Sequence, residues 1–244
     1  MFLENVPNIL KLGMQTLLLE LVKKRGFTLR WCLFSACEVG APHRRKGWYC
    51  IANRSPITSI KFPKSNKFEW TKEPHRMLLH PEKKHCIRHY LLGNAVVSYA
   101  ARKAYEYLLT QDNNTNTEVF EIPKHGYATK TKSGNIHVFS IQKKDSKCRT
   151  LNLVLDPKIY TSTKPPHSFL ATDLVKTSIK INRWGTPTSS TLGPANYLTE
   201  RSKIPLHTQV RFELSTPNAL RKGRVSPEFV EWMMGYPIGW TRFE

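Results

Sequence analysis

Three short segments of the sequence combine residues that carry charge with residues that shape the backbone. The first is Glu-Asn-Val at 4–6, the second is Gly-Ala-Pro-His-Arg-Arg-Lys at 40–46, and the third is Gly-Asn-Ala-Val-Val at 93–97. A carboxyl group can exchange a proton with a substrate, and a guanidinium can hold an oxygen on which negative charge develops. Each segment is common on its own. The segments indicate a function only through their order along the chain and the elements that carry them.

The elements around the first two segments predict the far edge of an α/β sheet. Residues 1–6 have the pattern of a strand that is ending, and apolar residues recur at helical spacing over 10–22. Two more strands are expected over 28–34 and 48–52. The order strand, helix, strand, strand is typical of a layered α/β domain.

The third segment is expected to open a helix. Apolar residues share one face from Gly93 to Leu109, and Asn94 is suited to cap its start. Residues 53–90 are rich in Pro, Lys and His, which indicates a surface connection. A short helix is also expected from Pro227 to Met234, because proline is favoured at the first helical position.

Between these helices the sequence changes from a helical pattern to a β-like, lysine-rich one. The polar tract 111–116 is expected to be a linker, and β-like runs follow at 117–122, 135–141 and 150–155. The lysines interleaved with these runs are Lys130, Lys132, Lys143, Lys144 and Lys147. This pattern predicts a small, basic, strand-rich domain.

The charge of the whole chain favours a polyanionic partner. Among 244 residues, 38 Lys and Arg face 18 Asp and Glu, which gives a formal net charge of +20. A protein with this positive charge attracts polyanions, of which nucleic acid is the commonest. The apolar stretch 10–22 is too short and too interrupted by charge to span a bilayer, so no membrane partner is expected.

The cysteines and the N-terminus favour an intracellular protein of unknown compartment. The five cysteines are odd in number and form no CxxC pair, which predicts free thiols in a reducing compartment. Nothing at the start has the pattern of a signal peptide. The His and Cys residues between 75 and 89 fit no closed four-ligand pattern, so no metal site is predicted.

Taken together, the three segments resemble those of cytosine-5 DNA methyltransferases, most closely the forms of phages and large DNA viruses. In that family an ENV element ends a strand, a GxPQxRxR-like element joins the next two strands, and a GNAV element opens a helix. Residues 227–241 (PEFVEWMMGYP, then Gly-Trp-Thr after Ile238) resemble a further family segment, and 198–213 resemble the region leading to it. The resemblance covers residues 2–110 and 184–241.

The resemblance implies a reaction and two catalytic residues. In the family, the enzyme flips a cytosine out of the duplex, adds a thiolate to C6, and transfers a methyl group from S-adenosylmethionine to C5. Addition of the thiolate pushes negative charge towards N3 and O2 of the base. Glu4 would then protonate or hydrogen-bond N3, and Arg45 would hold O2.

The same motifs imply further site residues. Asn5 would orient the loop after the strand, and His43 and Arg44 would join it as substrate-binding residues. Asn94 and Ala95 match the helix-opening element that, in the family, packs beside the S-adenosylmethionine pocket. Most of that pocket belongs to family segments that have no counterpart in this sequence.

The sequence departs from the family pattern at several points. His43 stands at the glutamine of the GxPQxRxR-like element, and Gly47 stands at its second arginine. No cysteine follows a proline, although the family's nucleophile lies in a Pro-Cys pair, and no GxG sequence occurs for the donor loop. The expectation is therefore a truncated or split enzyme that needs an N-terminal polypeptide and is inactive alone.

The expected fold is α/β, with a partial Rossmann-like methyltransferase core and a small β-rich target-recognition domain. The core would occupy residues 1–110, including the GNAV helix, and the target-recognition domain 111–183. A return segment with the PEFVEWMMGYP helix would occupy 184–244. The expected substrate is double-stranded DNA.

Structural alternatives to these roles remain open. Glu4 can be an ordinary acid at a strand end, and Arg44 and Arg45 can form a solvated turn or contact phosphates without base chemistry. The lysines of 124–149 can form a solubilising face, although phosphate contact is favoured. The stripe 232–234 is better explained by core packing than by base stacking. A second hypothesis for the whole chain is a non-catalytic, basic DNA-binding protein built on the same scaffold.

Overall fold

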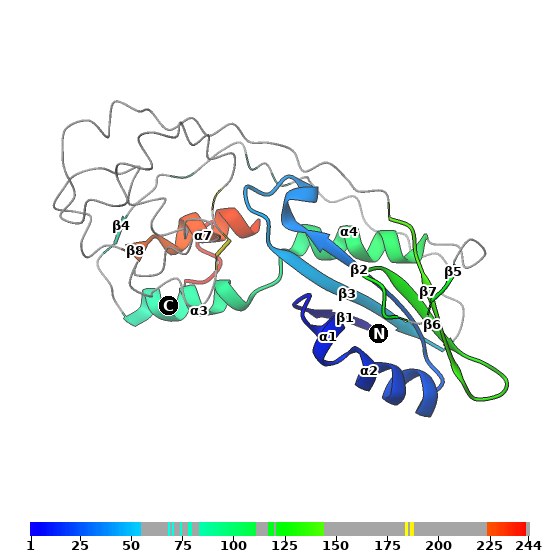
Figure 1. Cartoon of the computed structure of the whole chain (residues 1–244). Helices are drawn as coiled ribbons and strands as arrows, with labels where there is room; N and C mark the ends of the chain where they lie inside the picture. The colour runs from blue at the N-terminus through cyan, green and yellow to red at the C-terminus, as the bar shows by residue number, and fades with distance from the viewer. Residues whose placement is uncertain are drawn as a thin grey trace, which may run out of the picture. The chain divides into compact units, whose positions relative to one another are not determined.

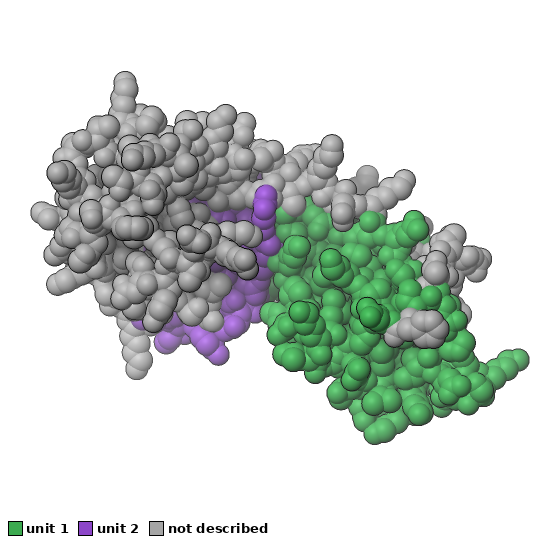
Figure 2. Space-filling model, in the orientation of Figure 1, with its two compact units in different colours: residues 1–39, 46–67, 96–148 green, residues 40–45, 68–95, 149–244 purple. Residues whose placement is uncertain are grey.

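The computed structural model describes residues 1–54, 68, 70, 74, 78–79, 83–110, 117–119, 121–143, 184, 186–187 and 224–242. The chain divides into two compact units (Figure 2). Unit 1 comprises residues 1–39, 46–67 and 96–148, and unit 2 comprises residues 40–45, 68–95 and 149–244.

Unit 1 is built on one antiparallel sheet of six strands (Figure 1). Its strands are β1 (Phe2–Asn5), β2 (Thr28–Ser35), β3 (Lys46–Asn53), β5 (Thr117–Glu118), β6 (Gly126–Lys130) and β7 (Ile136–Ser140). Their order in the sheet is β1-β3-β2-β6-β7-β5, and each pairing between described strands is antiparallel. The mixed α/β class is confirmed, whereas the Rossmann-like arrangement stays a prediction.

The sheet continues across the boundary that was expected at residue 110. Strand β6 pairs with β2, with Leu29 opposite Ala128. The described part of the 111–183 segment therefore extends the sheet of residues 2–53 instead of forming a sheet of its own. The runs expected at 117–122 and 135–141 correspond to β5 and β7, and the expected linker at 111–116 and run at 150–155 lie outside the described residues.

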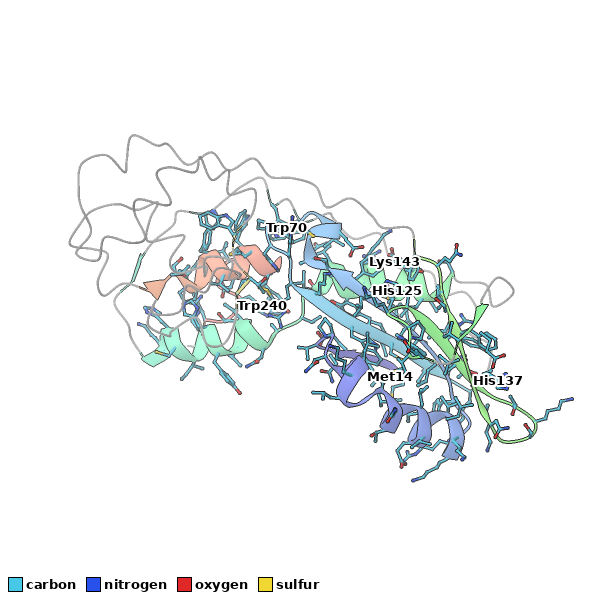
Figure 3. The ribbon with its side chains drawn as sticks, viewed as in Figure 1. Met14, Trp70, His125, His137, Lys143 and Trp240 are labelled. Carbon is cyan, nitrogen blue, oxygen red and sulfur yellow. The ribbon has the colours of Figure 1, made fainter. Side chains whose placement is uncertain are left out.

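One face of the sheet is covered by the N-terminal helical segment. This segment consists of α1 (Ile9–Leu12), α2 (Met14–Leu17) and the π-helical η1 (Leu18–Lys24). Its apolar side and the sheet form a core of nine buried residues, of which Met14 is labelled in Figure 3: Met14, Leu18, Val22, Leu29, Trp31, Trp48, Cys50, Ala52 and Ala128. The helical period expected over 10–22 thus supplies the core face.

Helix α4 (Ser98–Leu109) covers the opposite face. The ring of Phe2 packs edge-on against Tyr105 with a centroid distance of 5.0 Å. Near the other end of the helix, the guanidinium Nη1 of Arg30 donates to the carbonyl oxygen of Leu108 at 3.4 Å. Because side chains two apart on a strand share a face, Glu4 lies on the same face as Phe2.

One of the lysines expected to contact phosphate is instead buried in unit 1. The Lys143 ammonium donates to Glu38 Oε2 at 2.7 Å and to the Leu33 carbonyl at 2.8 Å, and it lies over the Phe34 ring at 3.5 Å (Figure 3). Its side chain is only 5% exposed. Lys143 therefore ties β7 to the end of β2, and a phosphate role for this residue is wrong.

The helix expected over 93–109 is two helices. Helix α3 (Lys83–Asn94) ends where the single helix was expected to begin, and α4 starts at Ser98. Asn94 does not cap a start, because Val97 holds the N-cap position and the Asn94 amide donates back to the Tyr90 carbonyl at 3.0 Å. Most of α3 lies in the segment expected to be a surface connection, where its basic, weakly amphipathic sequence gave no helical signal.

Unit 2 contains α3, α7 (Pro227–Met234) and a short pairing of β4 (Leu78–Leu79) with β8 (Arg224–Val225). The bounds expected for α7 are confirmed. Ser226 Oγ accepts from the Phe229 amide at 3.2 Å to cap its start, and Gly235 ends it with a left-handed φ of 78°. Residues 232–234 are buried, so the core interpretation of that stripe is confirmed.

The cysteines differ in part from expectation. Cys32, Cys50 and Cys86 are free, but Cys37 is disulfide-bonded, so the expectation that all thiols are free is wrong. An odd number of cysteines leaves room for one such pair. Burial raises the pKa of Cys32 to about 12, which makes that thiol unreactive at neutral pH.

Among the described residues no helix is long and apolar enough to cross a bilayer.

Candidate functional site

Glu4 lies near the end of the edge strand β1 with its side chain exposed. In the antiparallel ladder it faces Tyr49 of β3 directly. The next residue, Asn5, accepts a hydrogen bond from the Val6 amide on its Oδ1 at 2.8 Å, which shapes the backbone where the strand stops. The strand and this local bond therefore hold the Glu4 carboxylate at an accessible strand end.

Tyr49 takes up the space beside Gly47, where the family pattern has its second arginine. A Cβ atom placed on Gly47 would lie 2.6 Å from Tyr49 Oη and 2.7 Å from Cζ. Tyr49 is buried, so its ring has little freedom to move aside. The glycine and the tyrosine thus form a pair, and no longer side chain fits at position 47 without displacing the phenol. Sequence reasoning missed Tyr49, and its only signal was the glycine at an arginine position.

We expect Gly47→Ala to lower the free energy of unfolding by about 1–3 kcal/mol, because the added methyl group overpacks against the Tyr49 ring. The same change in a Tyr49→Val background should cost clearly less. Urea denaturation of the four proteins measures this coupling. Equal costs in the two backgrounds would show that the ring does not limit position 47.

The second sequence element lies in unit 2 and is organised around His43, whose side chain is fully buried. Its Nε2 lies 3.1 Å from the Met233 carbonyl oxygen, and its Nδ1 accepts from the Arg45 amide at 3.3 Å. These partners require a neutral imidazole that carries its proton on Nε2. Burial lowers the pKa of His43 to about 3, and the nearby Arg45 charge acts in the same direction.

His43 therefore offers one donor and one acceptor, as a glutamine amide can. A histidine at the position where the resemblance places a glutamine can therefore make the two hydrogen bonds seen here. Both ring nitrogens have protein partners, so the geometry gives His43 a role in positioning the Arg45 backbone.

The titration of His43 predicts a loss of stability in acid. Between pH 6.5 and about 3 the unfolded chain binds a proton that the folded chain does not, so the free energy of unfolding falls as the pH falls through that window. His43→Gln removes this proton uptake and keeps the two hydrogen bonds. We expect urea midpoints of the two proteins to diverge progressively as the pH is lowered from about 7 to about 4, with the wild type losing more. Parallel curves would contradict a buried neutral His43.

Arg45 joins the second sequence element to the third within unit 2. Its Nη1 donates to the Gly93 carbonyl oxygen at 2.8 Å, next to Asn94 at the end of α3. The Ala95 amide donates to the Leu92 carbonyl at 3.3 Å as the helix ends. Arg44 is exposed, and so is Asn94. The structure thus brings 40–45 and 93–95 together, while Glu4 belongs to unit 1.

The C-terminal end of α7 anchors this turn. The Met233 carbonyl accepts from Trp70 Nε1 at 3.2 Å (Figure 3) as well as lying beside His43, and the Trp184 amide donates to the Pro42 carbonyl at 2.9 Å. The spacing of these residues along the chain does not predict these hydrogen bonds. They show that the PEFVEWMMGYP helix supports the arginine-bearing turn directly.

A buried ionic cluster fixes the turn that follows α7. The Arg88 guanidinium donates to Glu228 Oε1 and to Glu231 Oε1, each at 2.9 Å, and its Nε donates to Thr241 Oγ1 at 2.9 Å. Burial alone would raise the pKa of Glu228. The hydrogen bond to its own backbone and the Arg88 guanidinium outweigh burial, so the pKa lies below its ordinary value. Sequence reasoning missed this cluster entirely.

No group of three His, Cys, Asp or Glu side chains suited to a metal ion occurs within the part of the chain that the structure describes.

Comparison with known proteins assigns the family. The profile of the C-5 cytosine-specific DNA methylases matches residues 1–205. The chain is also similar to the Type II methyltransferase M.CviJI of Paramecium bursaria Chlorella virus IL3A, with 25% identity over 232 residues. That alignment covers 86% of this chain and 61% of the viral protein, so the chain spans less than two thirds of that relative. No solved structure matches the chain significantly.

The family match covers most of the sequence and includes all three motif segments, together with the turn that His43 and Arg45 organise. Enzymes of this family methylate cytosine in DNA and take the methyl group from S-adenosylmethionine. The chain belongs to the C-5 cytosine-specific DNA methylase family.

Proposed function

We propose that this chain supplies the base-binding part of a DNA cytosine-5 methyltransferase and works with an N-terminal polypeptide that supplies the nucleophile. Two separate observations support this most. Glu4 presents an exposed carboxylate near a strand end in unit 1, and in unit 2 the Arg45 guanidinium binds the Gly93 carbonyl while its amide donates to His43. Both stand at family motif positions within the matched residues.

The proposed chemistry is electrostatic. When a thiolate adds to C6 of an extruded cytosine, charge moves to N3 and O2, and methylation at C5 becomes feasible. Glu4 would give or share a proton at N3, and the positive charge of the Arg45 guanidinium would stabilise O2. Asn5, His43 and Arg44 would shape the substrate-binding loops, His43 through the Arg45 amide.

Two residues are proposed to lie beside the methyl donor. Asn94 and Ala95, at the end of α3, are suited to border an S-adenosylmethionine pocket, and Arg45 fixes the carbonyl of the preceding Gly93. S-adenosylmethionine would supply the methyl group transferred to C5.

The need for a partner rests on the sequence and on one strand edge. None of the five cysteines follows a proline, so the sequence has no counterpart of the family's Pro-Cys pair. In the described sheet β1 has a neighbour on one side only, so its free edge can accept a strand. We propose that the partner's strands complete a Rossmann-like core there, and that residues 111–183 take part in target recognition.

The net charge of +20 predicts a strong salt dependence of binding to double-stranded DNA. With about six phosphates contacted, affinity should fall about a thousandfold between about 50 and about 200 mM salt. Fluorescence anisotropy of a labelled duplex measures this. Binding that ignores salt, or no binding at low salt, would contradict a phosphate-contacting surface.

The missing Pro-Cys pair also favours a second candidate, a basic DNA-binding protein without catalysis. The two are separated by mixing this chain with a polypeptide carrying the Pro-Cys segment and the glycine-rich donor loop, together with duplex DNA and labelled S-adenosylmethionine. The enzyme proposal expects label in DNA only when both polypeptides are present. DNA binding without methylation by the mixture would favour the second candidate.

A further inference from the structure

Trp240 differs from every other tryptophan of the chain. The sequence contains six tryptophans, and all six are described. Trp240 is 64% exposed, whereas the other five are at most 7% exposed. Burying a tryptophan removes more apolar surface from water than burying almost any other residue, so an exposed tryptophan forgoes a stabilising contribution that the other five make.

The backbone on both sides of Trp240 is fixed by one buried carboxylate. Glu231, which is fully buried, accepts from the Gly239 amide at 2.6 Å and from the Thr241 amide at 2.8 Å, and also from Thr241 Oγ1 at 2.6 Å. Arg88 Nη2 balances its charge at 2.9 Å. A buried ion pair is costly to desolvate, and here its hydrogen bonds hold the two neighbours of an exposed aromatic ring.

The ring of Trp240 is also supported from one side. It stacks on Tyr236 with a centroid distance of 5.8 Å and an interplanar angle of 19° (Trp240 is labelled in Figure 3). Arg242, two residues further along the chain, pairs through Nη2 with Glu228 Oε1 at 3.5 Å, but its side chain is 68% exposed, so the guanidinium can still contact a phosphate. A rigid aromatic face with a cation beside it suits the π-face of a nucleobase next to a phosphate.

We infer that Trp240 is a stacking platform for a DNA base that has left the helical stack, with Arg242 contacting an adjacent phosphate. This inference rests on the proposed function, because an enzyme that acts on an extruded cytosine leaves bases unpaired. The stack on Tyr236 and the clamp by Glu231 pre-organise the ring, so that little conformational entropy is lost on binding.

The test compares a duplex that has one unpaired base with the same duplex fully paired. Wild-type protein should bind the unpaired form at least about fivefold more tightly, and Trp240→Ala should remove that preference, whereas Trp240→Phe should keep much of it. Because the other five tryptophans are buried, quenching of the long-wavelength tryptophan emission by the unpaired form reports on Trp240. Arg242→Ala should reduce the salt dependence of binding, while Trp240→Ala should leave it unchanged.

Ile238→Ala is the matched control, since Ile238 lies on the same turn and is also exposed. Equal losses for Ile238→Ala and Trp240→Ala, or an emission shift that depends on protein concentration without DNA, would indicate an apolar protein contact and overturn the inference. Salt-dependent binding of the wild type with no quenching would also overturn it and leave the proposed function standing. Absence of any DNA binding would overturn both.

Discussion

Replacement of Glu4 by alanine should lower the rate of methyl transfer by about a hundredfold or more when this chain is assayed with a polypeptide that carries the family's Pro-Cys segment. The reason is that charge pushed onto N3 of the base loses the group that neutralises it. Glu4 is exposed on an edge strand, so the fold should survive the change. The measurement is the incorporation of labelled methyl groups into duplex DNA at saturating donor, with DNA affinity measured in parallel.

Glu20→Ala is the matched control for this experiment. Glu20 is an acid of the same unit, and its contact is a surface ion pair with Lys24, so its loss should change neither rate nor stability appreciably. Glu4→Gln should remain severely impaired, because an amide cannot give up a proton at N3. Wild-type rates in Glu4→Ala would exclude Glu4 from the chemistry, and a loss of DNA affinity alone would assign it to binding.

Replacement of Glu231 by alanine should destabilise unit 2 by about 3–5 kcal/mol. The change leaves the buried Arg88 guanidinium without a main partner and frees the amides of Gly239 and Thr241. Urea denaturation followed by tryptophan emission is a suitable measurement, because Trp70, Trp184 and Trp232 are buried in the same unit.

Glu228→Ala provides the comparison for Glu231. Glu228 also contacts Arg88 at 2.9 Å, but its side chain is 22% exposed, and solvent can replace part of what is lost. Its cost should therefore be clearly smaller than that of Glu231→Ala. Equal and small costs for both variants would mean that the cluster does not hold the 235–241 turn.

The sequence predicted the elements whose apolar pattern is simple. The three N-terminal strands, the helical face over 10–22 and the helix Pro227–Met234 could be identified because each combines a clear period with a clear stop signal. Helix α3 could not, because a run such as Lys-Lys-His-Cys-Ile-Arg-His-Tyr shows a weak period, and its stability comes from packing against α7. The break at 95–97 was also hidden, because apolar residues continue through it.

Motif positions were easier to predict than their surroundings. Glu4, His43 and Arg45 could be singled out by residue type and order, but their partners come from distant parts of the chain. The Met233 carbonyl beside His43 and the Gly93 carbonyl bound by Arg45 are backbone groups, which leave no trace in residue types. The Arg88–Glu231 cluster spans 143 positions of sequence and depends on how α3 packs on α7.

Under the proposed function, this chain stabilises charge on the cytosine while a partner polypeptide supplies the thiolate. A duplex with 5-fluorocytosine at the target base tests it most directly. After the thiolate adds to C6 and the methyl group is transferred to C5, fluorine cannot leave as a cation, so the partner's cysteine stays bonded to the DNA. On a denaturing gel, we expect this adduct only when both polypeptides and the methyl donor are present, with far less formed by Glu4→Ala. Equal adduct formation by the partner without this chain would contradict it.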